Sequence, residues 1–322
     1  SGGLTDVDDS LLPNSPDDGF DHNKVLEAVA ILRHGGLVGI PTETVYGLAA
    51  NVENDTALRR LFAVKFRHLS HPLIVHIGDV SQLQKWSRNV PQAAMELAKH
   101  FWPGPLTMLL HRSDRVSMVA TGGRDTVALR IPAHSVTLEL LRQFNGAVAA
   151  PSANRFGKVS PTTAAHVIAD LGDDVDLVLD GGPCVIGVES TIIDMTLPVP
   201  QLLRPGGIST EAIESVLNLK LDVSGSLARA PGMLESHYAP KCLVELVESA
   251  QAAQNRAQQL RKSDLQVEIL DYSNDVEAYA KDLYEFLRRA DRAKRDVVVA
   301  VMPAAVGIGI AIRDRLSKAA TR

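Results

Sequence analysis

The chain has 322 residues, of which 45% are hydrophobic and 22% charged, and its formal net charge is −5. This length and balance are typical of a soluble globular protein with two domains, and they exclude a general electrostatic attraction to nucleic acid or to an anionic membrane. Because there are only two cysteines, Cys184 and Cys242, and no apolar run near the roughly 20 residues that span a bilayer, we expect a cytoplasmic protein without a disulfide framework, zinc cluster or membrane contact.

The first residues differ in composition from the rest of the chain. Residues 1–20 are acidic, contain no Lys or Arg and have few apolar side chains, so we expect a flexible tail. The first helix should begin at Asp21, whose carboxylate suits an N-cap. Apolar residues then recur on one helical face from Val25 to Leu32, and the glycine pair at Gly35 should end the helix.

Short apolar runs alternate with helical patterns in the next part of the chain, which predicts an α/β sheet covered by helices. Some runs are separated by turns too short for a crossover helix, as around Gly181 and Pro198, so we expect a mixed sheet. This first domain should occupy residues 21–217. The expected strands are 37–40, 73–77, 106–110, 127–131, 147–150, 177–179, 191–193 and 201–203.

A linker and a second, smaller domain should follow. Residues 218–240 lack a long period and are interrupted by glycine and proline, and a linker of this length is often a functional lid. Residues 241–322 alternate strand and helix three times, which predicts a small Rossmann-like α/β domain. Its expected strands are 243–247, 267–270 and 297–302, and its expected helices are 251–261, 276–289 and one from about 306.

The signatures of several common enzyme classes are missing. No G-x-x-x-x-G-K-[ST], H-E-x-x-H or G-x-S-x-G motif occurs, and no metal-ligating spacing is present, so we expect no protein-bound metal site. Gly307 and Gly309 follow a strand and open a helix, as in a nicotinamide-dependent oxidoreductase. However, Ile312 stands where a third glycine belongs, and no further strand with an acidic residue placed to hold a ribose follows. Close packing of the last helix is the better interpretation.

A dispersed set of polar residues remains, and its members follow predicted strands, where α/β sheets place ligands. Lys65, Arg67, Arg130 and Arg204 are four cations with mainly apolar neighbours, and together they suit a polyphosphate and a carboxylate. Taken singly, each could equally form a surface salt bridge. Taken singly, the nearby Ser and Thr residues are better explained as turn and capping residues and the histidines as ordinary partly buried side chains, and only the ordered combination points to a site.

The order of the polar blocks is distinctive. They are Gly39-Ile-Pro-Thr-Glu-Thr-Val-Tyr-Gly-Leu48, Lys65-x-Arg67, Pro72-Leu-Ile-Val-His76, Ala150-Pro-Ser-Ala-Asn154, Gly187-Val-Glu-Ser-Thr-Ile192 and Leu203-Arg-Pro-Gly206. This series resembles the YrdC family over residues 35–208. The linker and the small domain resemble the longer, two-domain form of that family.

The resemblance implies a YrdC-like twisted open sheet with a large, positively charged cavity. It also implies a nucleotidyltransferase, an L-threonylcarbamoyladenylate synthase. Such an enzyme forms threonylcarbamoyl-AMP and pyrophosphate from L-threonine, bicarbonate or CO2, and ATP, and so serves the threonylcarbamoyladenosine modification of tRNA next to the anticodon. Mg²⁺ would accompany ATP. A downstream tRNA threonylcarbamoyl-transferase machinery would receive the product, with at most a weak contact to tRNA.

Residue roles are also implied by the resemblance. Lys65 and Arg67 would be the catalytic cations and would contact ATP. The threonine pocket would consist of Thr44, His76, Arg130, Ala150 and Ser190. Further ATP contacts would come from His71, Thr126, Ser152, Asn154, Ser160, Arg204 and Tyr238.

The sequence departs from the family pattern at two places. His71 stands where members commonly carry Asn, and Leu234, Glu235 and Ser236 stand where many have basic residues, so we expect no phosphate contact from that part of the linker. The alternative function is an RNA-binding module in which the same cations follow a phosphate backbone without chemistry. The aromatic content of the chain, 4%, offers few side chains on which the bases of single-stranded RNA could stack.

Overall fold

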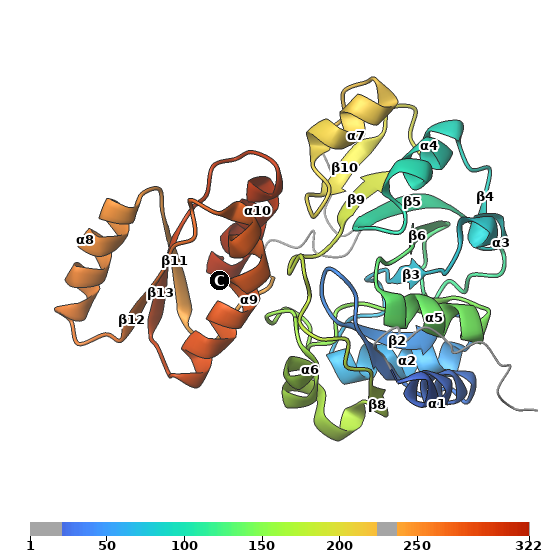
Figure 1. Ribbon diagram of the computed structural model, residues 1–322, viewed down its shortest axis with the longest axis horizontal. Coiled ribbons are helices and arrows are strands. Elements are labelled where there is room, and N and C mark those ends of the chain that lie inside the picture. The colour runs from blue at the N-terminus through green and yellow to red at the C-terminus, as the bar shows by residue number, and fades with distance from the viewer. Residues whose placement is uncertain (1–20, 224–236, 322) are drawn as a thin grey trace, which may run out of the picture.

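The computed structural model describes residues 21–223 and 237–321, which form a larger and a smaller lobe (Figure 1). The predicted tail, residues 1–20, and most of the predicted lid, including Leu234, Glu235 and Ser236, lie outside the described residues. In the described residues no helix is both long enough and apolar enough to cross a bilayer.

The larger lobe is built on one mixed sheet. Its strands are β1 (Val38–Ile40), β2 (Gly47–Asn51), β3 (Ile74–His76), β4 (Ser87–Arg88), β5 (Leu106–Arg112), β6 (Thr126–Arg130), β7 (Val148–Ala149), β8 (Leu177–Val178), β9 (Thr191–Asp194) and β10 (Gln201–Arg204). They lie in the order β10-β9-β5-β6-β3-β7-β2-β1-β8, and β4 pairs with β5. The predicted mixed sheet is confirmed, since β3 is parallel to β6 and antiparallel to β7.

Helices cover this sheet. They are α1 (His22–Arg33), α2 (Asp55–Lys65), α3 (Leu83–Trp86), α4 (Gln92–Phe101), α5 (Ser135–Phe144), α6 (Ala164–Leu171) and α7 (Thr210–Leu217). The predicted N-cap of α1 is confirmed, because the Asp21 carboxylate accepts bonds from the amides of Asn23 and Lys24. Helix α2 ends at Phe66, whose left-handed conformation (φ 55°) turns the chain sharply between Lys65 and Arg67.

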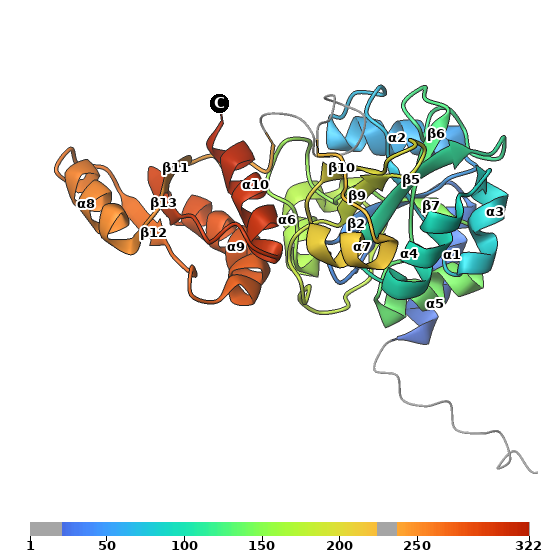
Figure 2. The same cartoon turned by 90° about the horizontal axis from the view of Figure 1, so that it is seen from above.

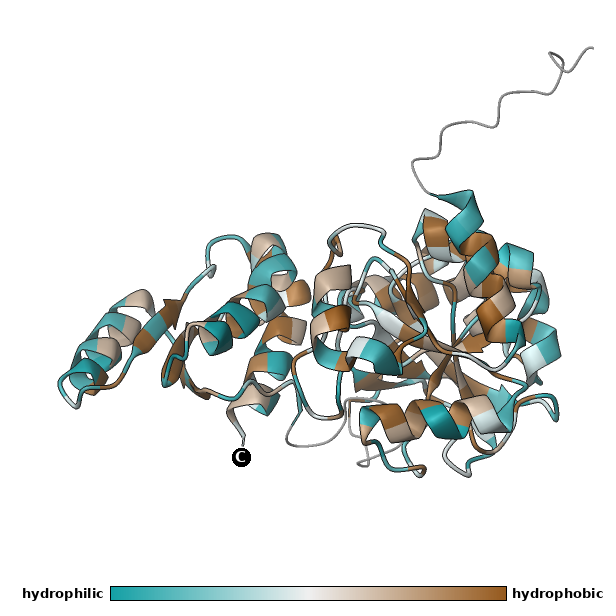
Figure 3. Cartoon of the chain, turned by 90° about the horizontal axis from the view of Figure 1, so that it is seen from below, coloured by the Kyte–Doolittle hydropathy of each residue, from teal (hydrophilic) through white to brown (hydrophobic). Residues whose placement is uncertain are grey.

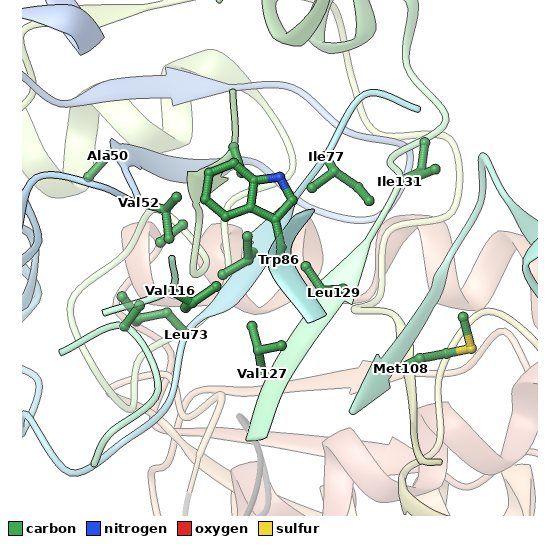
Figure 4. Packing of buried hydrophobic residues seen from close by; sticks show 14 of the residues in the cluster. Ala50, Val52, Leu73, Ile77, Trp86, Met108, Val116, Val127, Leu129 and Ile131 are labelled. Atoms are coloured by element: carbon green, nitrogen blue, oxygen red, sulfur yellow. The ribbon is translucent and has the colours of Figure 1, made fainter. Parts of the chain in front are cut away.

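Alternate residues of the strands enter two separate cores. Val38 and Ala49 pack with α1 and α5, whereas Leu37 and Leu48 belong to a larger cluster on the other side. Trp86 is fully buried within that larger cluster (Figure 4). Strand β2 is not among the predicted strands because it is buried on both sides and rich in small residues, so it shows no alternation of polar and apolar residues.

The smaller lobe is a parallel three-stranded sheet with helices. It contains β11 (Leu243–Val247), α8 (Ala250–Arg261), β12 (Val267–Leu270), α9 (Val276–Arg292), β13 (Val297–Val301) and α10 (Ile308–Ala320), with the strand order β11-β13-β12. Its strands are hydrophobic and α8 presents a largely hydrophilic surface (Figure 3). A Cβ on Gly309 would lie 2.2 Å from the Ala304 carbonyl oxygen, which supports the packing interpretation of this glycine.

Helices α9 and α10 face the larger lobe, and α8 lies on the far side (Figure 2). Arg288 of α9 forms an ion pair of 2.7 Å with Asp170 of α6. Gly187 approaches α9 so closely that a Cβ there would lie 2.4 Å from the Ala280 carbonyl oxygen, and its φ of +89° is one that L residues rarely adopt. The two lobes are therefore in direct contact through both polar and close backbone packing.

Candidate active site

Loops from distant parts of the chain surround one hollow with a free volume of about 50 Å³. The predicted single cationic chamber is therefore present, and residues of the linker help to close it. The lining residues are Thr42, Thr44, Val45, Gly47, Arg67, Ile74, His76, Arg130, Ala150, Pro151, Ser152, Glu189, Ser190, Arg204, His237 and Tyr238.

The turn between β1 and β2 forms one wall. The Thr42 hydroxyl donates to the Val45 carbonyl (2.6 Å), so its 2.9 Å contact with the Thr44 hydroxyl requires Thr44 to donate. Arg130 donates to the Thr44 oxygen from Nη1 at 3.0 Å. Because this hydroxyl gives its one proton to Thr42, it can only accept a further bond from a ligand.

A buried ion pair supports this wall. Arg130 Nη2 donates to the Glu43 carboxylate, whose other oxygen accepts the Ala133 amide at 2.7 Å. Burial, together with the nearby Arg204, lowers the pKa of Arg130 to about 9, which leaves the guanidinium charged at neutral pH. The pair thus holds a positive charge beside Thr44 with its orientation fixed.

A second wall is formed by residues at the ends of β9 and β10. Arg204 donates from Nε to the Ser190 carbonyl (2.9 Å) and from Nη2 to the Ser190 hydroxyl (3.1 Å). The Thr107 hydroxyl lies 2.7 Å from the same Ser190 oxygen. Ser190 is therefore held rigidly next to a second buried cation.

Glu189 is a lining residue that the sequence interpretation missed. Its carboxylate accepts bonds from the Ser160 hydroxyl (2.7 Å), the Tyr284 hydroxyl (2.7 Å) and Arg315 Nε (3.0 Å). Burial alone would raise the pKa of this carboxyl, but Arg315 and Arg204 oppose that effect and hold the pKa at about 2. A charged carboxylate therefore borders a hollow that is otherwise cationic.

Lys65 and Arg67 have different positions. Lys65 is fully buried, and its Nζ donates to the carbonyls of Ser152 (2.5 Å) and Asn154 (2.6 Å), so it shapes that loop and does not line the hollow. Burial, with Arg67 nearby, lowers the pKa of Lys65 well below its usual range. Arg67 lines the hollow and donates from Nη2 to the Pro72 carbonyl at 2.6 Å.

Several polar atoms near Arg67 are buried without a hydrogen-bond partner among the described residues: Arg67 Nε, His71 Nδ1, Asn154 Oδ1 and the Tyr238 hydroxyl. An unsatisfied buried polar group costs about 1–3 kcal/mol, so such a cluster is typical of a ligand site. The rings of His71 and Phe156 lie 4.9 Å apart and those of Phe156 and His237 5.4 Å apart. A row of contacting rings therefore lies beside the unsatisfied atoms.

The two lining histidines are neutral at physiological pH. Burial lowers the pKa of His76 to about 4 and that of His237 to about 3. His76 Nδ1 lies 3.2 Å from the Ile74 carbonyl and therefore donates to it. Its Nε2 is then left as an acceptor.

Most predicted site residues meet at the hollow: Thr44, Arg67, His76, Arg130, Ala150, Ser152, Ser190, Arg204 and Tyr238. Lys65, Asn154 and Ser160 lie behind its lining and bond to the loops that form it. His71 and Thr126 are also outside the lining. They belong to neighbouring parts of the sheet, because Ile74 pairs with Ala128, so their assignment as ATP contacts stays a prediction.

Two family models match the chain. The model Sua5_yciO_yrdC, described as "Telomere recombination", matches residues 30–206, and the model described as "Threonylcarbamoyl-AMP synthase, C-terminal domain" matches residues 208–321. The chain belongs to the Sua5/YciO/YrdC family. The predicted family is confirmed, and so are its sheet architecture and its second, smaller α/β domain.

Relatives of this Sua5/YciO/YrdC protein match along almost the whole chain. The threonylcarbamoyl-AMP synthase of Pyrococcus abyssi is 41% identical, with 92% of this chain and 94% of the relative covered. That of Bacillus subtilis is 39% identical, with 98% and 96% covered. The crystal structure of P. abyssi Sua5 complexed with L-threonine has a TM-score of 0.89 at 40% identity, with 93% of this chain and 95% of that chain covered.

Proposed function

We propose that the protein is an L-threonylcarbamoyladenylate synthase, a nucleotidyltransferase that makes threonylcarbamoyl-AMP and pyrophosphate for the modification of tRNA. The observation that carries the proposal is the hollow that gathers Arg67, Arg130 and Arg204 beside the hydroxyls of Thr44 and Ser190. The names of the P. abyssi and B. subtilis relatives and the L-threonine complex of a relative support it.

The Thr44–Arg130 wall suits L-threonine. The Thr44 hydroxyl can only accept from a ligand, so it fits the hydroxyl or the ammonium group of threonine, and Arg130 and Arg204 place positive charge where a carboxylate can lie. A site that bonds a substrate hydroxyl can reject an analogue without it by about 10⁴-fold. With its oxygen bonded to the substrate hydroxyl, Thr44 would favour threonine over valine.

The region around Arg67 suits ATP. Its unsatisfied donors and acceptors can bond phosphate and base, and the neighbouring aromatic surface can stack on a purine. Among residues 21–223 and 237–321 no group of three metal-ligating side chains occurs. The carboxylate that lines the hollow, Glu189, and the one that supports it from behind, Glu43, are each engaged by an arginine. We therefore propose that Mg²⁺ arrives bound to the phosphates of ATP, where it would neutralise part of their charge.

The chemistry requires positioning more than a nucleophilic side chain. The threonine amine attacks the carbon of CO2 to give a carbamate with loss of one proton. If bicarbonate is the substrate, the amine proton and the departing hydroxide leave together as one water. A carbamate oxygen then attacks the α-phosphorus of ATP, and pyrophosphate leaves as the bond to the β-phosphate oxygen breaks. Several anions meet, so Arg67, Arg130 and Arg204 would act by fixing and stabilising charge.

The RNA-binding alternative is disfavoured by burial. Lys65, Arg130 and Arg204 have exposed fractions of 1%, 3% and 3%, so a continuous phosphate backbone cannot reach them. The proposed function instead requires a single nucleotide to reach the lining arginines through the open mouth of the hollow. Action in the cytoplasm, transfer of the product to tRNA-modifying machinery and a weak contact with tRNA remain part of the proposal.

Pyrophosphate release from ATP tests the proposed function. We expect release to require both L-threonine and bicarbonate, and we expect the product to have the mass of threonylcarbamoyl-AMP. Equal release without threonine would contradict the proposal and would indicate simple ATP hydrolysis. RNA binding alone would give no release and a steep loss of RNA affinity with salt.

A further inference from the structure

The smaller lobe contributes side chains to the back of the hollow. Arg315 of α10 and Tyr284 of α9 are both fully buried, with an exposed fraction of 0%. Arg315 Nε lies 3.0 Å from Glu189 Oε1, and the Tyr284 hydroxyl lies 2.7 Å and 3.0 Å from the two Glu189 oxygens. A residue that lines the hollow is therefore held by two residues of another domain.

The carboxylate of Glu189 needs this help. The larger lobe gives it one direct donor among the described residues, the neutral Ser160 hydroxyl at 2.7 Å. Arg315 is the cation in contact with it, because Arg204 acts on it through space. An uncompensated buried carboxylate would repel a polyphosphate entering the same hollow, and in this weakly screened setting the repulsion is large.

Arg315 also touches two other parts of the site. Its Nη1 donates to the Pro205 carbonyl at 2.7 Å, next to Arg204, and its guanidinium carbon lies 5.2 Å from the centre of the Tyr238 ring. Tyr238 is buried in a left-handed conformation (φ 58°), and its hydroxyl has no partner among the described residues. One arginine thus connects Glu189, the end of β10 and a residue of the linker.

We propose that Arg315 is a positioning residue of the hollow: it offsets the charge of Glu189 and supports Tyr238, so that docking of the smaller lobe makes the hollow able to bind the polyanionic part of the nucleotide. The inference rests on the proposed function, because it takes ATP as the anion. Through Arg315, the smaller lobe would contribute to nucleotide binding and not only to stability.

The test compares full-length variants with the wild-type chain. Arg315→Met removes the charge, Arg315→Lys keeps it, and Glu189→Gln/Arg315→Met removes both charges of the pair. Arg313→Met is the matched control, because Arg313 lies on the same helix and pairs at 3.3 Å with the exposed Glu248. Affinities for ATP, inorganic tripolyphosphate and L-threonine are measured by calorimetry at low and high salt.

We expect Arg315→Met to weaken ATP and tripolyphosphate binding by about tenfold or more, with a smaller loss at high salt. L-Threonine, a zwitterion without net charge, should change by less than about threefold. The double variant should recover most of the polyphosphate affinity, because it removes the uncompensated carboxylate. Arg315→Lys should stay within about threefold of wild type, and Arg313→Met should match it.

Other outcomes overturn the inference. Unchanged polyphosphate affinity in folded Arg315→Met would do so, and so would an equal loss for threonine and polyphosphate that the double variant does not restore. If Arg315→Met does not fold, the double variant and Arg315→Lys decide, and loss of polyphosphate binding in both would refute the charge offset. If the wild type binds no ATP, the proposed function fails, and the tripolyphosphate titrations still decide the role of Arg315. Failure of the wild type to bind tripolyphosphate would refute the role itself.

Discussion

Two buried arginine–glutamate pairs border the same hollow, and they differ in the origin of their partners. Arg130 and Glu43 both belong to the larger lobe, each with 4% of its side chain exposed. Glu189 belongs to the larger lobe and Arg315 to the smaller one, with 7% and 0% exposed. One wall is therefore complete once the larger lobe folds, whereas the other requires contact between the lobes.

The difference separates two tasks that share one hollow. The wall with Arg130 carries the hydroxyl and the charge proposed for threonine, and both are fixed within one domain. The wall with Glu189 lies beside Tyr238 and Ser160, which are proposed nucleotide contacts. Changes in the Arg130–Glu43 pair should therefore affect folding and threonine binding together, while changes in the Glu189–Arg315 pair should affect nucleotide binding.

The largest effect should come from breaking the pair within one lobe. Arg130→Met leaves Glu43 buried without its cation, which typically costs about 3–5 kcal/mol of unfolding free energy. Denaturant unfolding of the larger lobe measures this loss, and Glu43→Gln/Arg130→Met should recover a substantial part of it. A loss below about 1 kcal/mol in the single variant would show that this wall does not depend on the pair.

Arg67 belongs to neither ion pair, and its Nε has no hydrogen-bond partner among the described residues. Its substitution therefore tests a cation that is not held by a glutamate. Arg67→Ala should lower the rate of pyrophosphate release by about 10²–10³-fold, because it removes charge stabilisation from the reacting phosphates. Circular dichroism should show an intact fold. Arg142→Ala is the control, since Arg142 is exposed and pairs only with Glu139 on its own helix in the described contacts. Near-normal turnover in folded Arg67→Ala would refute the assignment.

Thr44→Val tests whether the first wall recognises threonine. The substitution removes the hydroxyl that accepts from Arg130 while it keeps the shape of the side chain. We expect L-threonine affinity to fall by about 10-fold or more, because the buried Arg130 donor loses its partner. ATP affinity should change little. Titrations of each ligand measure this split. An equal loss of both affinities would show that the two walls do not act separately.

The smallest effect should be the pH dependence that His76 gives to the first wall. Histidine takes up a proton near pH 6.5 in the unfolded chain, but burial lowers the pKa of His76 to about 4 in the folded protein. Acid therefore favours unfolding: this contribution is complete above pH 6.5 and is lost as the pH falls toward 4. Between pH 7 and 5 it should amount to about 1–2 kcal/mol of unfolding free energy.

Denaturant unfolding at the two pH values isolates this contribution by comparison of variants. His76→Gln should lose less stability on acidification than the wild type by the stated amount. The exposed His100 offers a control, and His100→Gln should follow the wild type. Identical pH dependence in all three chains would show that His76 does not carry the effect.

Much of the fold followed from local patterns, because the predicted strands are short apolar runs and each polar block follows one of them. The polar blocks contain the arginines that line the hollow. The sequence did not distinguish Lys65, which bonds to loop carbonyls, from Arg67, which lines the hollow. Both are basic residue types and lie two residues apart. The left-handed turn at Phe66, at a residue type that rarely adopts it, separates them.

The carboxylates of the hollow were missed for a different reason. Glu43 and Glu189 belong to the polar blocks of the sequence. The role of a negative residue in an anion-binding site cannot be inferred until its cationic partner is known. The partner of Glu189 is Arg315, 126 residues further along the chain. The helical period places Arg315 on the buried face of α10 with Ile312 and Ala319, but only the contact between the lobes reveals which carboxylate it meets.

Gly187 sets how near the second domain can come. The carbonyl of Ala280 occupies the space that any Cβ would need, and Ala280 and Tyr284 lie one turn apart on the same helix. Even a methyl group at this position would displace α9 and move the Tyr284 hydroxyl away from the Glu189 carboxylate. The absence of a side chain at Gly187 thus allows α9 to pack closely enough for Tyr284 to bond to Glu189.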